Sequence, residues 1–391
     1  MARVAESSRR EALRRLRGAA LAGLASAAGT ACAEAPLAAP SSTPGATPAA
    51  RMARWRTPQC GFNIGVLDER RHDEAFMRDA AAYGARQVRL LLPMGAEGAR
   101  PRFEPPVRQG LARVLLRAER AGLDLVLVPE RLAEPKSPLW QQGGLGAEGA
   151  AFADAWAQMA RDLRDADAVA GFDLLNEPNP PWPDGRIGSS AAIWDALARR
   201  VVAAIRSEDH GVPVLLEGVA GGGPQGVPVL GAWRDAALVY SLHFYLPHEI
   251  THQGVSARWP KAVRYPTDDD TPLRGTPAHP GPWNRERLRR ELADAAARGQ
   301  RDGVPVHVGE FSCVRWAPGD SAANYVGDCL ALFAGFGWSW SYHEFRGWPG
   351  WDAETTGPGL HPVPRRADAP VMRLLRDAFA AAPRPREGTL R

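Results

Sequence analysis

Eight short apolar segments recur between residues 62 and 342, and amphipathic stretches separate them. Each segment has the length of a β-strand, and largely apolar strands are typical of a parallel sheet that is covered on both faces. The strand candidates are Phe62–Val66, Gln87–Leu92, Leu123–Val128, Val169–Leu175, Val212–Leu216, Ala237–Phe244, Val304–Gly309 and Gly337–Tyr342. The helix candidates are His72–Tyr83, Gly110–Ala121, Ala150–Asp165, Ala191–Ser207, Arg285–Arg298, Ala322–Phe333 and Ala367–Ala380.

This alternation predicts an α/β protein with a closed (β/α)8 barrel, the TIM-barrel fold, because right-handed crossovers wind successive βα units in one direction. We expect a single domain over residues 55–385. An open doubly wound sheet is the alternative, but no Gly-x-Gly-x-x-Gly follows the first strand, which argues against its dinucleotide-binding version. Long loops follow the fourth strand (179–190) and the sixth strand (247–283), on the face where such barrels build active sites.

Residues 1–33 have the features of a twin-arginine export signal. A basic region opens at Ser8-Arg9-Arg10, the apolar stretch Gly18–Ala31 is too short to span a bilayer, and Ala31-Cys32-Ala33 is a small-x-small cleavage site. A basic amphipathic tail and a lipid anchor on Cys32 are the alternatives. Residues 34–54, rich in Pro, Ala and Ser, are expected to be a flexible spacer. We therefore expect an exported protein, periplasmic or secreted, without a membrane span.

The net charge gives no reason to expect a polyanionic partner. The chain has 48 Lys and Arg against 44 Asp and Glu, a formal charge of +4. Cleavage after Ala33 would remove six Arg and two Glu, a loss of +4, so the mature chain is near neutral. Nucleic acid and anionic membranes are therefore not expected as partners. We expect a monomer.

Removal of the signal would leave Cys60, Cys313 and Cys329, an odd number, so at most one disulfide can form in an oxidising compartment. Cys313 with Cys329 is the preferred pair. No Cys-x-x-Cys spacing suggests a structural metal site, and neither a metal nor a cofactor is expected.

Two glutamates follow strand candidates on what would be the same rim of the barrel. Glu177 ends the fourth strand in Leu175-Asn176-Glu177-Pro178, and Glu310 ends the seventh in Val308-Gly309-Glu310-Phe311. Retaining glycoside hydrolysis needs two carboxyl groups about 5 Å apart, one to protonate the leaving group and one to attack the anomeric carbon. Arginine and tyrosine donors would hold one carboxyl as the anion, and the other is expected to be the more desolvated of the two.

Further polar and aromatic side chains are expected at this rim. A period of two places His243 and Tyr245 on one face of the sixth strand. Arg89 is a charge inside an apolar strand and needs a carboxylate partner. Flat rings stack on pyranose sugars, and Trp340 is preferred for this role over Trp182, Trp316 and Trp348, while Trp338 and Trp351 also lie around the eighth strand. Glu130, Glu217 and Glu344 also lie near strand ends and are interpreted as structural.

These motifs, in this order along the chain, resemble glycoside hydrolase family 5, a clan A set of cellulases, mannanases and related β-glycanases on a (β/α)8 barrel. They are Asn176-Glu177-Pro178, His243-x-Tyr245, Gly309-Glu310-Phe311 and Trp340. The resemblance implies the following roles: Glu177 as acid/base, Glu310 as nucleophile, Asn176 on the sugar 2-hydroxyl, Arg89 and Tyr245 beside Glu310, His243 lining the −1 subsite and Trp340 as its platform. The chain departs from the family at Val128-Pro129-Glu130, where members often have a histidine.

The resemblance implies a retaining endo-β-1,4-glucanase, a cellulase that acts by double displacement on a β-linked oligo- or polysaccharide. A β-mannanase and an exo-acting β-glucosidase-like enzyme are alternatives within the family. A non-catalytic carbohydrate-binding barrel is an alternative outside it, and would need neither Glu177 nor Glu310. An esterase on an open sheet would need a Gly-x-Ser-x-Gly elbow, which this sequence lacks.

Overall fold

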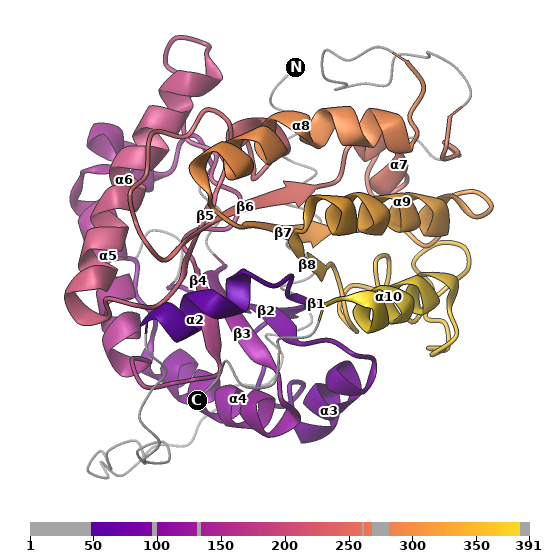
Figure 1. Cartoon of the computed structure of the whole chain (residues 1–391), viewed down its shortest axis with the longest axis horizontal. Coiled ribbons are helices and arrows are strands. Elements are labelled where there is room, and N and C mark those ends of the chain that lie inside the picture. Colours follow the sequence, from indigo (N-terminus) through magenta and orange to yellow (C-terminus); the bar gives the residue numbers. More distant parts are fainter. Residues whose placement is uncertain (1–47, 96–99, 131–133, 260–261, 268–280, 384–391) are drawn as a thin grey trace.

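The computed structural model describes residues 48–95, 100–130, 134–259, 262–267 and 281–383. Eight parallel strands form a closed barrel in the order β1 to β8, and β8 pairs with β1 (Figure 1). The strands are β1 Cys60–Val66, β2 Gln87–Leu92, β3 Asp124–Pro129, β4 Val169–Asp173, β5 Val214–Glu217, β6 Leu238–Phe244, β7 Val306–Phe311 and β8 Ser339–Tyr342. The predicted fold class is confirmed.

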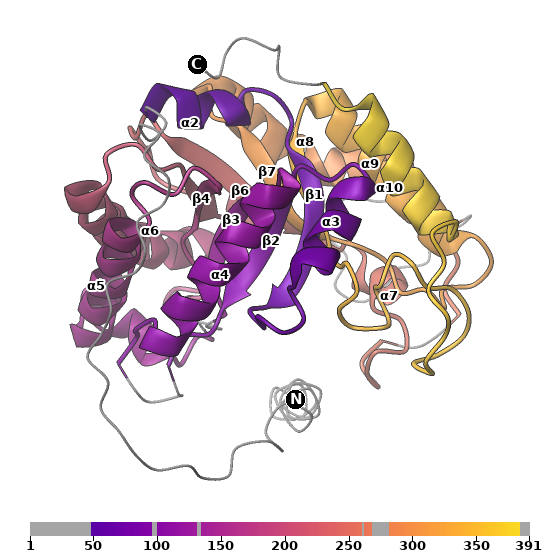
Figure 2. The same ribbon diagram turned by 90° about the horizontal axis from the view of Figure 1, so that it is seen from below.

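Helices surround the barrel and cover its outer face (Figures 1 and 2). They are α2 Pro48–Trp55, α3 Glu74–Ala82, α4 Pro105–Ala121, α5 Ala147–Asp162, α6 Ile187–Glu208, α7 His248–Thr251, α8 Arg285–Asp302, α9 Ser321–Phe336 and α10 Pro370–Ala381, with the 3-10 helices η1 Pro138–Gly144 and η2 Pro224–Gly226. In the described chain, the connection between β5 and β6 carries only η2. None of the described helices combines the length and apolar character that crossing a membrane would require.

Two apolar layers hold the barrel together. The larger packs the outer face of the strands against the helices and includes Phe62, Phe172 and Phe311. The smaller lies inside the barrel, where Trp55 packs against Val126 and its neighbours on β4, β5 and β6. Because strand side chains alternate, the residues between these inward-facing positions point to the helices.

The folded domain begins earlier than the predicted boundary at residue 55. Helix α2 lies at the end of the barrel opposite α7 (Figure 2), and the Trp55 indole donates to the Ala170 carbonyl oxygen at 2.9 Å. Arg51 pairs with Asp209 at 2.6 Å, and both side chains are buried. The end of the predicted spacer is therefore part of the domain, because its Arg and Trp side chains bind the barrel. The predicted signal and the spacer up to residue 47 lie outside the described residues.

The expected disulfide is not present. Cys60, Cys313 and Cys329 are free and buried in the structure. The Cys313 thiol donates instead to the Ile250 carbonyl oxygen, with 3.6 Å between sulfur and oxygen. Burial raises the pKa of Cys60 to about 12, so this thiol stays protonated and unreactive.

Candidate active site

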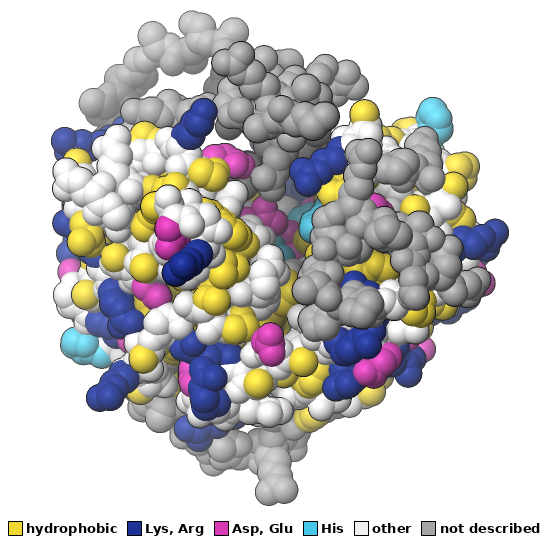
Figure 3. Space-filling model, turned by 90° about the horizontal axis from the view of Figure 1, so that it is seen from above, with side chains coloured by type: hydrophobic (Ala, Val, Ile, Leu, Met, Phe, Trp, Pro, Cys, Tyr) yellow, Lys and Arg dark blue, Asp and Glu magenta, His cyan; other side chains and the backbone are white. Residues whose placement is uncertain are grey.

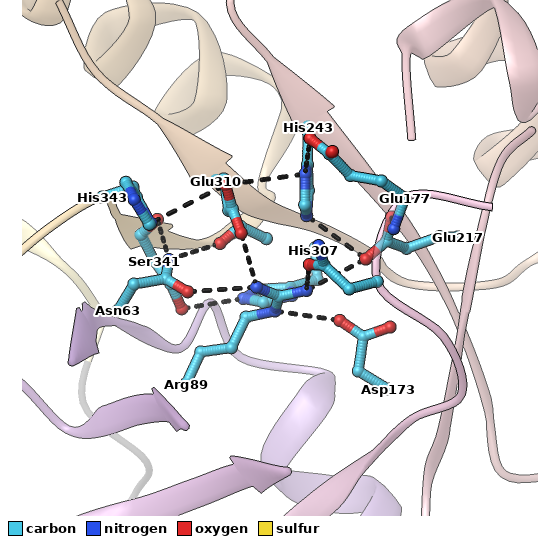
Figure 4. Close-up of polar contacts among 12 residues, drawn as sticks. Asn63, Arg89, Asp173, Glu177, Glu217, His243, His307, Glu310, Ser341 and His343 are labelled. Carbon is cyan, nitrogen blue, oxygen red and sulfur yellow. Dashed lines mark hydrogen bonds and ion pairs between the residues drawn. The ribbon is translucent and has the colours of Figure 1, made fainter. Parts of the chain in front are cut away.

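A polar cluster fills the barrel where the strands end, and every strand except β3 contributes to it (Figure 4). Apolar residues fill the opposite end, so the polar side chains converge on the rim where barrel enzymes bind their substrates. The cluster comprises Asn63, Arg89, Asp173, Asn176, Glu177, Glu217, His243, Tyr245, Glu310 and His343.

Arg89 lies at the centre of this cluster and is fully buried. All three of its guanidinium nitrogens donate hydrogen bonds, five in all. The acceptors are Asp173 Oδ2 (2.9 Å), Asn63 Oδ1 (3.1 Å), Glu310 Oε1 (2.8 Å), Asn176 Oδ1 (2.9 Å) and Glu217 Oε1 (3.0 Å). Arg89 thus has the carboxylate partners that its sequence position requires, three rather than one.

Glu310, at the end of β7, is held as an anion. Its Oε1 accepts from Arg89, and its Oε2 accepts from the Tyr245 hydroxyl at 3.0 Å. Burial by itself would raise the pKa of Glu310, but His243, His343 and Arg89 together lower it to about 2. The expectation that arginine and tyrosine would flank one carboxylate is met at Glu310.

Glu177 follows β4 in a left-handed backbone conformation, with φ of +51°. Residues other than glycine adopt this conformation at a cost, and it often marks functional positions. Its Oε1 lies 3.3 Å from His243 Nδ1, and its side chain is 21% exposed against 9% for Glu310. The expectation that the second carboxyl is the more desolvated is therefore wrong: Glu177 faces the opening while Glu310 sits deeper, against Arg89.

Glu177, His243 and Glu310 each place a nitrogen or oxygen atom within 4.8 Å of the other two. The two carboxyl groups therefore flank one small space, as a retaining glycosidase requires. These three side chains could also surround a cation. However, the carboxylates of Glu217 and Glu310 raise the pKa of His243 well above its usual range, against the effect of burial. A protonated imidazole has no lone pair for a metal, so the three fit a sugar site better.

Trp340 does not lie in this site, which corrects the predicted platform. On β8, Ser341 points into the barrel and contacts His307 at 3.1 Å, so Trp340 points outward. Its ring stacks on Phe379 of α10 with 5.1 Å between centroids, and it is 3% exposed. Trp340 is therefore part of the packing between barrel and helix.

Other rings lie beside Glu310. His343, two residues after Ser341, returns to the inner face, and its Nδ1 lies 3.7 Å from Glu310 Oε2. Trp351 packs edge-on against His343 and is tilted over Tyr245, with centroids 5.5 and 5.9 Å apart. One face of the molecule is hollowed near its centre, and acidic and histidine side chains are visible inside (Figure 3). Trp182, in the loop after β4, is 42% exposed.

The structure brings six predicted residues together and adds four that sequence reasoning missed. Arg89, Asn176, Glu177, His243, Tyr245 and Glu310 all belong to the cluster. Asn63, Asp173 and His343 were not predicted, and Glu217 was named near a strand end but interpreted as structural. Asp173 gave a signal of the kind that identified Arg89, a charge inside an apolar strand, and Glu217 gave a weaker one as a carboxylate at a strand end.

The family model for cellulase (glycosyl hydrolase family 5) matches residues 69–345. Endoglucanase C of Acetivibrio thermocellus is 24% identical over 213 residues, which cover 49% of this chain and 59% of that protein, so the match spans little more than half of the relative's length.

Solved structures show the same fold at low sequence identity. Thermotoga maritima Cel5A in complex with cellobiose has a TM-score of 0.64 and 18% identity, covering 82% of this chain and 98% of the other. The same enzyme with mannotriose has a TM-score of 0.63 and 18% identity, covering 84% and 99%. These similarities establish the barrel architecture independently of the paired carboxylates.

Proposed function

The chain belongs to glycosyl hydrolase family 5, and from that premise we propose that it hydrolyses internal β-1,4 linkages of a β-glucan with retention of anomeric configuration. The observation that carries the proposal is the approach of a Glu177 oxygen and a Glu310 oxygen to within 4.8 Å. Inverting enzymes need a wider gap, because a water molecule must fit between the second carboxylate and the sugar.

In the first step, Glu310 would attack the anomeric carbon while Glu177 donates its proton to the glycosidic oxygen. The bond from carbon to the leaving oxygen breaks, and a covalent glycosyl-enzyme forms on Glu310. The lowered pKa of Glu310 suits this role, since the nucleophile must be ionised at working pH.

In the second step, Glu177 would act as a base. It takes a proton from water, the water oxygen attacks the anomeric carbon, and Glu310 leaves as a carboxylate. Because Glu177 contacts the His243 imidazole and is more exposed than Glu310, it is the carboxyl that incoming water and leaving sugar can reach.

The neighbours of Glu310 would orient the sugar. Asn176 accepts from Arg89 through its Oδ1, which directs its amide N–H groups away from the guanidinium and makes them available to the sugar 2-hydroxyl. Tyr245 donates to Glu310 and fixes the carboxylate that attacks. His243 lies between the two glutamates and would line the same subsite.

A β-glucan is the proposed substrate because the related Endoglucanase C and several structural neighbours are named as endoglucanases. A β-mannan is the second candidate, because one neighbour was solved with mannotriose as well as with cellobiose. The equatorial and axial 2-hydroxyls of the two sugars would meet Asn176 differently.

The test is hydrolysis of a panel of soluble β-glucans and β-mannans, with product sizing and NMR detection of the first anomer formed. We expect a rapid fall in chain length on a β-1,4-glucan and initial release of the β-anomer. Initial α-anomer would overturn the retaining mechanism, and release of single sugars from the start would overturn endo action. Cleavage of mannan alone would transfer the proposal to mannanase.

Export is proposed from residues 1–33 alone. The expected result is that the full chain, expressed in a bacterium with twin-arginine transport, reaches the periplasm or medium. Replacement of Arg9 and Arg10 by lysine should retain it in the cytoplasm. Equal export of both forms would contradict the twin-arginine assignment.

A further inference from the structure

Glu217, the last residue of β5, is a third glutamate in the cluster and is fully buried. Its Oε1 accepts from Arg89 at 3.0 Å and lies 3.2 Å from His243 Nε2. Its Oε2 accepts the backbone N–H of Glu177 at 3.0 Å. One carboxylate therefore contacts the two cationic side chains beside Glu310 and also the peptide of the proposed acid/base.

The contact to Glu177 restrains a peptide that is not in a common conformation. Glu177 has a φ of +51°, and its N–H points into the barrel rather than along a strand ladder. A buried N–H without an acceptor would be costly, so Glu217 stabilises the turn that aims the Glu177 side chain at the opening. His243 lies between Glu217 and the carboxyl end of the Glu177 side chain, 3.2 Å from Glu217 Oε1 and 3.3 Å from Glu177 Oε1.

Gly221, Gly222 and Gly223 form a glycine run after β5, and this run lies against Glu217. At Gly222, with φ of +74°, an added Cβ would lie 2.6 Å from Glu217 Oε2. The carbonyl oxygen of Gly222 accepts from the His243 backbone N–H at 2.7 Å, and Gly221 donates to the carbonyl oxygen of Pro178 at 3.1 Å. The loop thus packs directly on the carboxylate and ties it to the segment that carries Glu177.

We propose that Glu217 is a positioning residue for proton transfer by Glu177, and that the glycine run after β5 holds it in place. The inference rests on the proposed function and deepens it. Arg89 and Tyr245 restrain the nucleophile, whereas Glu217 restrains the acid/base through its peptide and through His243. Asp173 offers the natural contrast, because its Oδ2 accepts from Arg89 at 2.9 Å and its Oδ1 has no hydrogen-bond partner among the described residues.

This role predicts a dependence on the leaving group. Cleavage of 2,4-dinitrophenyl β-cellobioside needs little protonation, whereas cleavage of phenyl β-cellobioside needs the acid. kcat/KM reports the first step for both substrates. For Glu217→Gln we expect kcat/KM on the phenyl glycoside to fall about 100-fold, as for a catalytic group displaced by about 1 Å, and on the dinitrophenyl glycoside by less than about tenfold.

Two matched controls separate positioning from general damage. Asp173→Asn alters another carboxyl group that accepts from Arg89, and should lower kcat/KM on both glycosides by similar factors. Gly222→Ala would push on Glu217 Oε2, whereas Gly221→Ala has the same backbone strain, with φ of +72°, and open space around the added Cβ. Gly222→Ala should reproduce the leaving-group effect, and Gly221→Ala should leave the ratio of the two substrates unchanged.

The outcomes are distinct. An inactive wild-type enzyme on both glycosides and on the polysaccharide panel would remove the proposed function itself. If the wild type is active, the positioning role would be overturned by a Glu217→Gln variant that loses kcat/KM on the phenyl and the dinitrophenyl glycoside by the same factor. A variant that loses neither activity would also overturn it. If Glu217→Gln fails to fold by circular dichroism, the Gly222→Ala and Gly221→Ala pair decides: equal ratios in the two variants overturn the proposal.

Discussion

Arg89 Nη1 and Glu310 Oε1 meet at 2.8 Å in the buried centre of the barrel, and the same guanidinium also binds Asp173 and Glu217. One cation thus serves three carboxyl groups. Burial raises the pKa of Asp173, with the charge of Glu217 adding to the effect, so this carboxyl tends to keep its proton. The raised pKa values of His243 and Asp173 both favour their protonated forms, which together with Arg89 would offset the negative charge of Glu217 and Glu310.

Replacement of Arg89 by methionine should destabilise the fold strongly. It would leave the three carboxyl groups without their shared donor, and removal of one partner from a buried ion pair costs about 3–5 kcal/mol. Urea denaturation followed by tryptophan fluorescence measures the change. Arg161→Met is the control, since the Arg161 ion pair with Glu208 lies at the surface and should contribute little to stability. Similar losses in the two variants would contradict the central role of Arg89.

Glu310→Gln should abolish turnover while leaving the fold and sugar binding intact. Loss of a nucleophile lowers kcat by several orders of magnitude, on the order of 10³-fold or more. Hydrolysis of a β-1,4-glucan and calorimetric binding of cellotetraose are measured in parallel. Glu291→Gln, a buried glutamate paired with Arg287 on α8, is the matched control and should keep its activity. Unchanged hydrolysis by Glu310→Gln would favour another nucleophile, and absence of turnover in the wild type would favour the binding-barrel alternative.

Sequence reasoning located what depends on local pattern. Each of the eight predicted strands overlaps an observed one, with both ends within two residues. Glu177 and Glu310 converge because they follow β4 and β7 of one parallel barrel, where all strand ends share a rim. The alternation of strand and helix segments, together with the position of each glutamate at a strand end, was sufficient to predict that Glu177 and Glu310 lie close together.

What could not be predicted depends on side-chain direction and on contacts between distant segments. Trp340 was assigned to the pocket because it lies on the eighth strand. Its neighbour Ser341 points into the barrel, and because strand side chains alternate, Trp340 points outward to Phe379. A shift of one residue in register reverses the two faces of a strand, and sequence does not fix the register. The role of Glu217 can be inferred only from the structure, where its carboxylate accepts from both Arg89 and the Glu177 backbone N–H.

His243 should make stability decline at alkaline pH. Its folded-state pKa is raised well above 6.5 by Glu217 and Glu310, so its contribution is fully present below about pH 6.5 and is lost as pH rises through the folded-state value. The free energy of unfolding measured from pH 5 to 9 should fall less steeply above pH 6.5 in His243→Asn than in the wild type.

His307 should affect the pH dependence of stability in the opposite direction to His243. Burial, with Arg89 adding to it, lowers its pKa well below the usual range, so it stays neutral in the fold. Its contribution is present above about pH 6.5 and is lost as pH falls below that value. His307→Asn should therefore flatten the acidic side of the stability profile. If the pH profiles of both His243→Asn and His307→Asn matched that of the wild type, neither imidazole would be linked to folding in this way.

Substitution of Trp340 should mainly lower stability, whereas substitution of Trp351 should mainly weaken sugar binding. Trp340 is 3% exposed and stacked on Phe379, so Trp340→Ala leaves a cavity and should cost about 3–5 kcal/mol of stability. Trp351 is only partly buried and packs against Tyr245 and His343 beside Glu310, so Trp351→Ala should cost less stability and should weaken sugar binding roughly tenfold, about 1.4 kcal/mol.

Both tryptophan substitutions are best measured in the Glu310→Gln background, where bound cello-oligosaccharide is not consumed. Calorimetry at a temperature below both unfolding transitions gives Kd, and thermal unfolding gives the loss of stability. The two effects should divide between the variants, because the Trp340 ring lies between β8 and α10 whereas the Trp351 ring lies beside Tyr245 and His343, two neighbours of Glu310. Weaker binding in Trp340→Ala than in Trp351→Ala would return the platform to the strand-eight tryptophan.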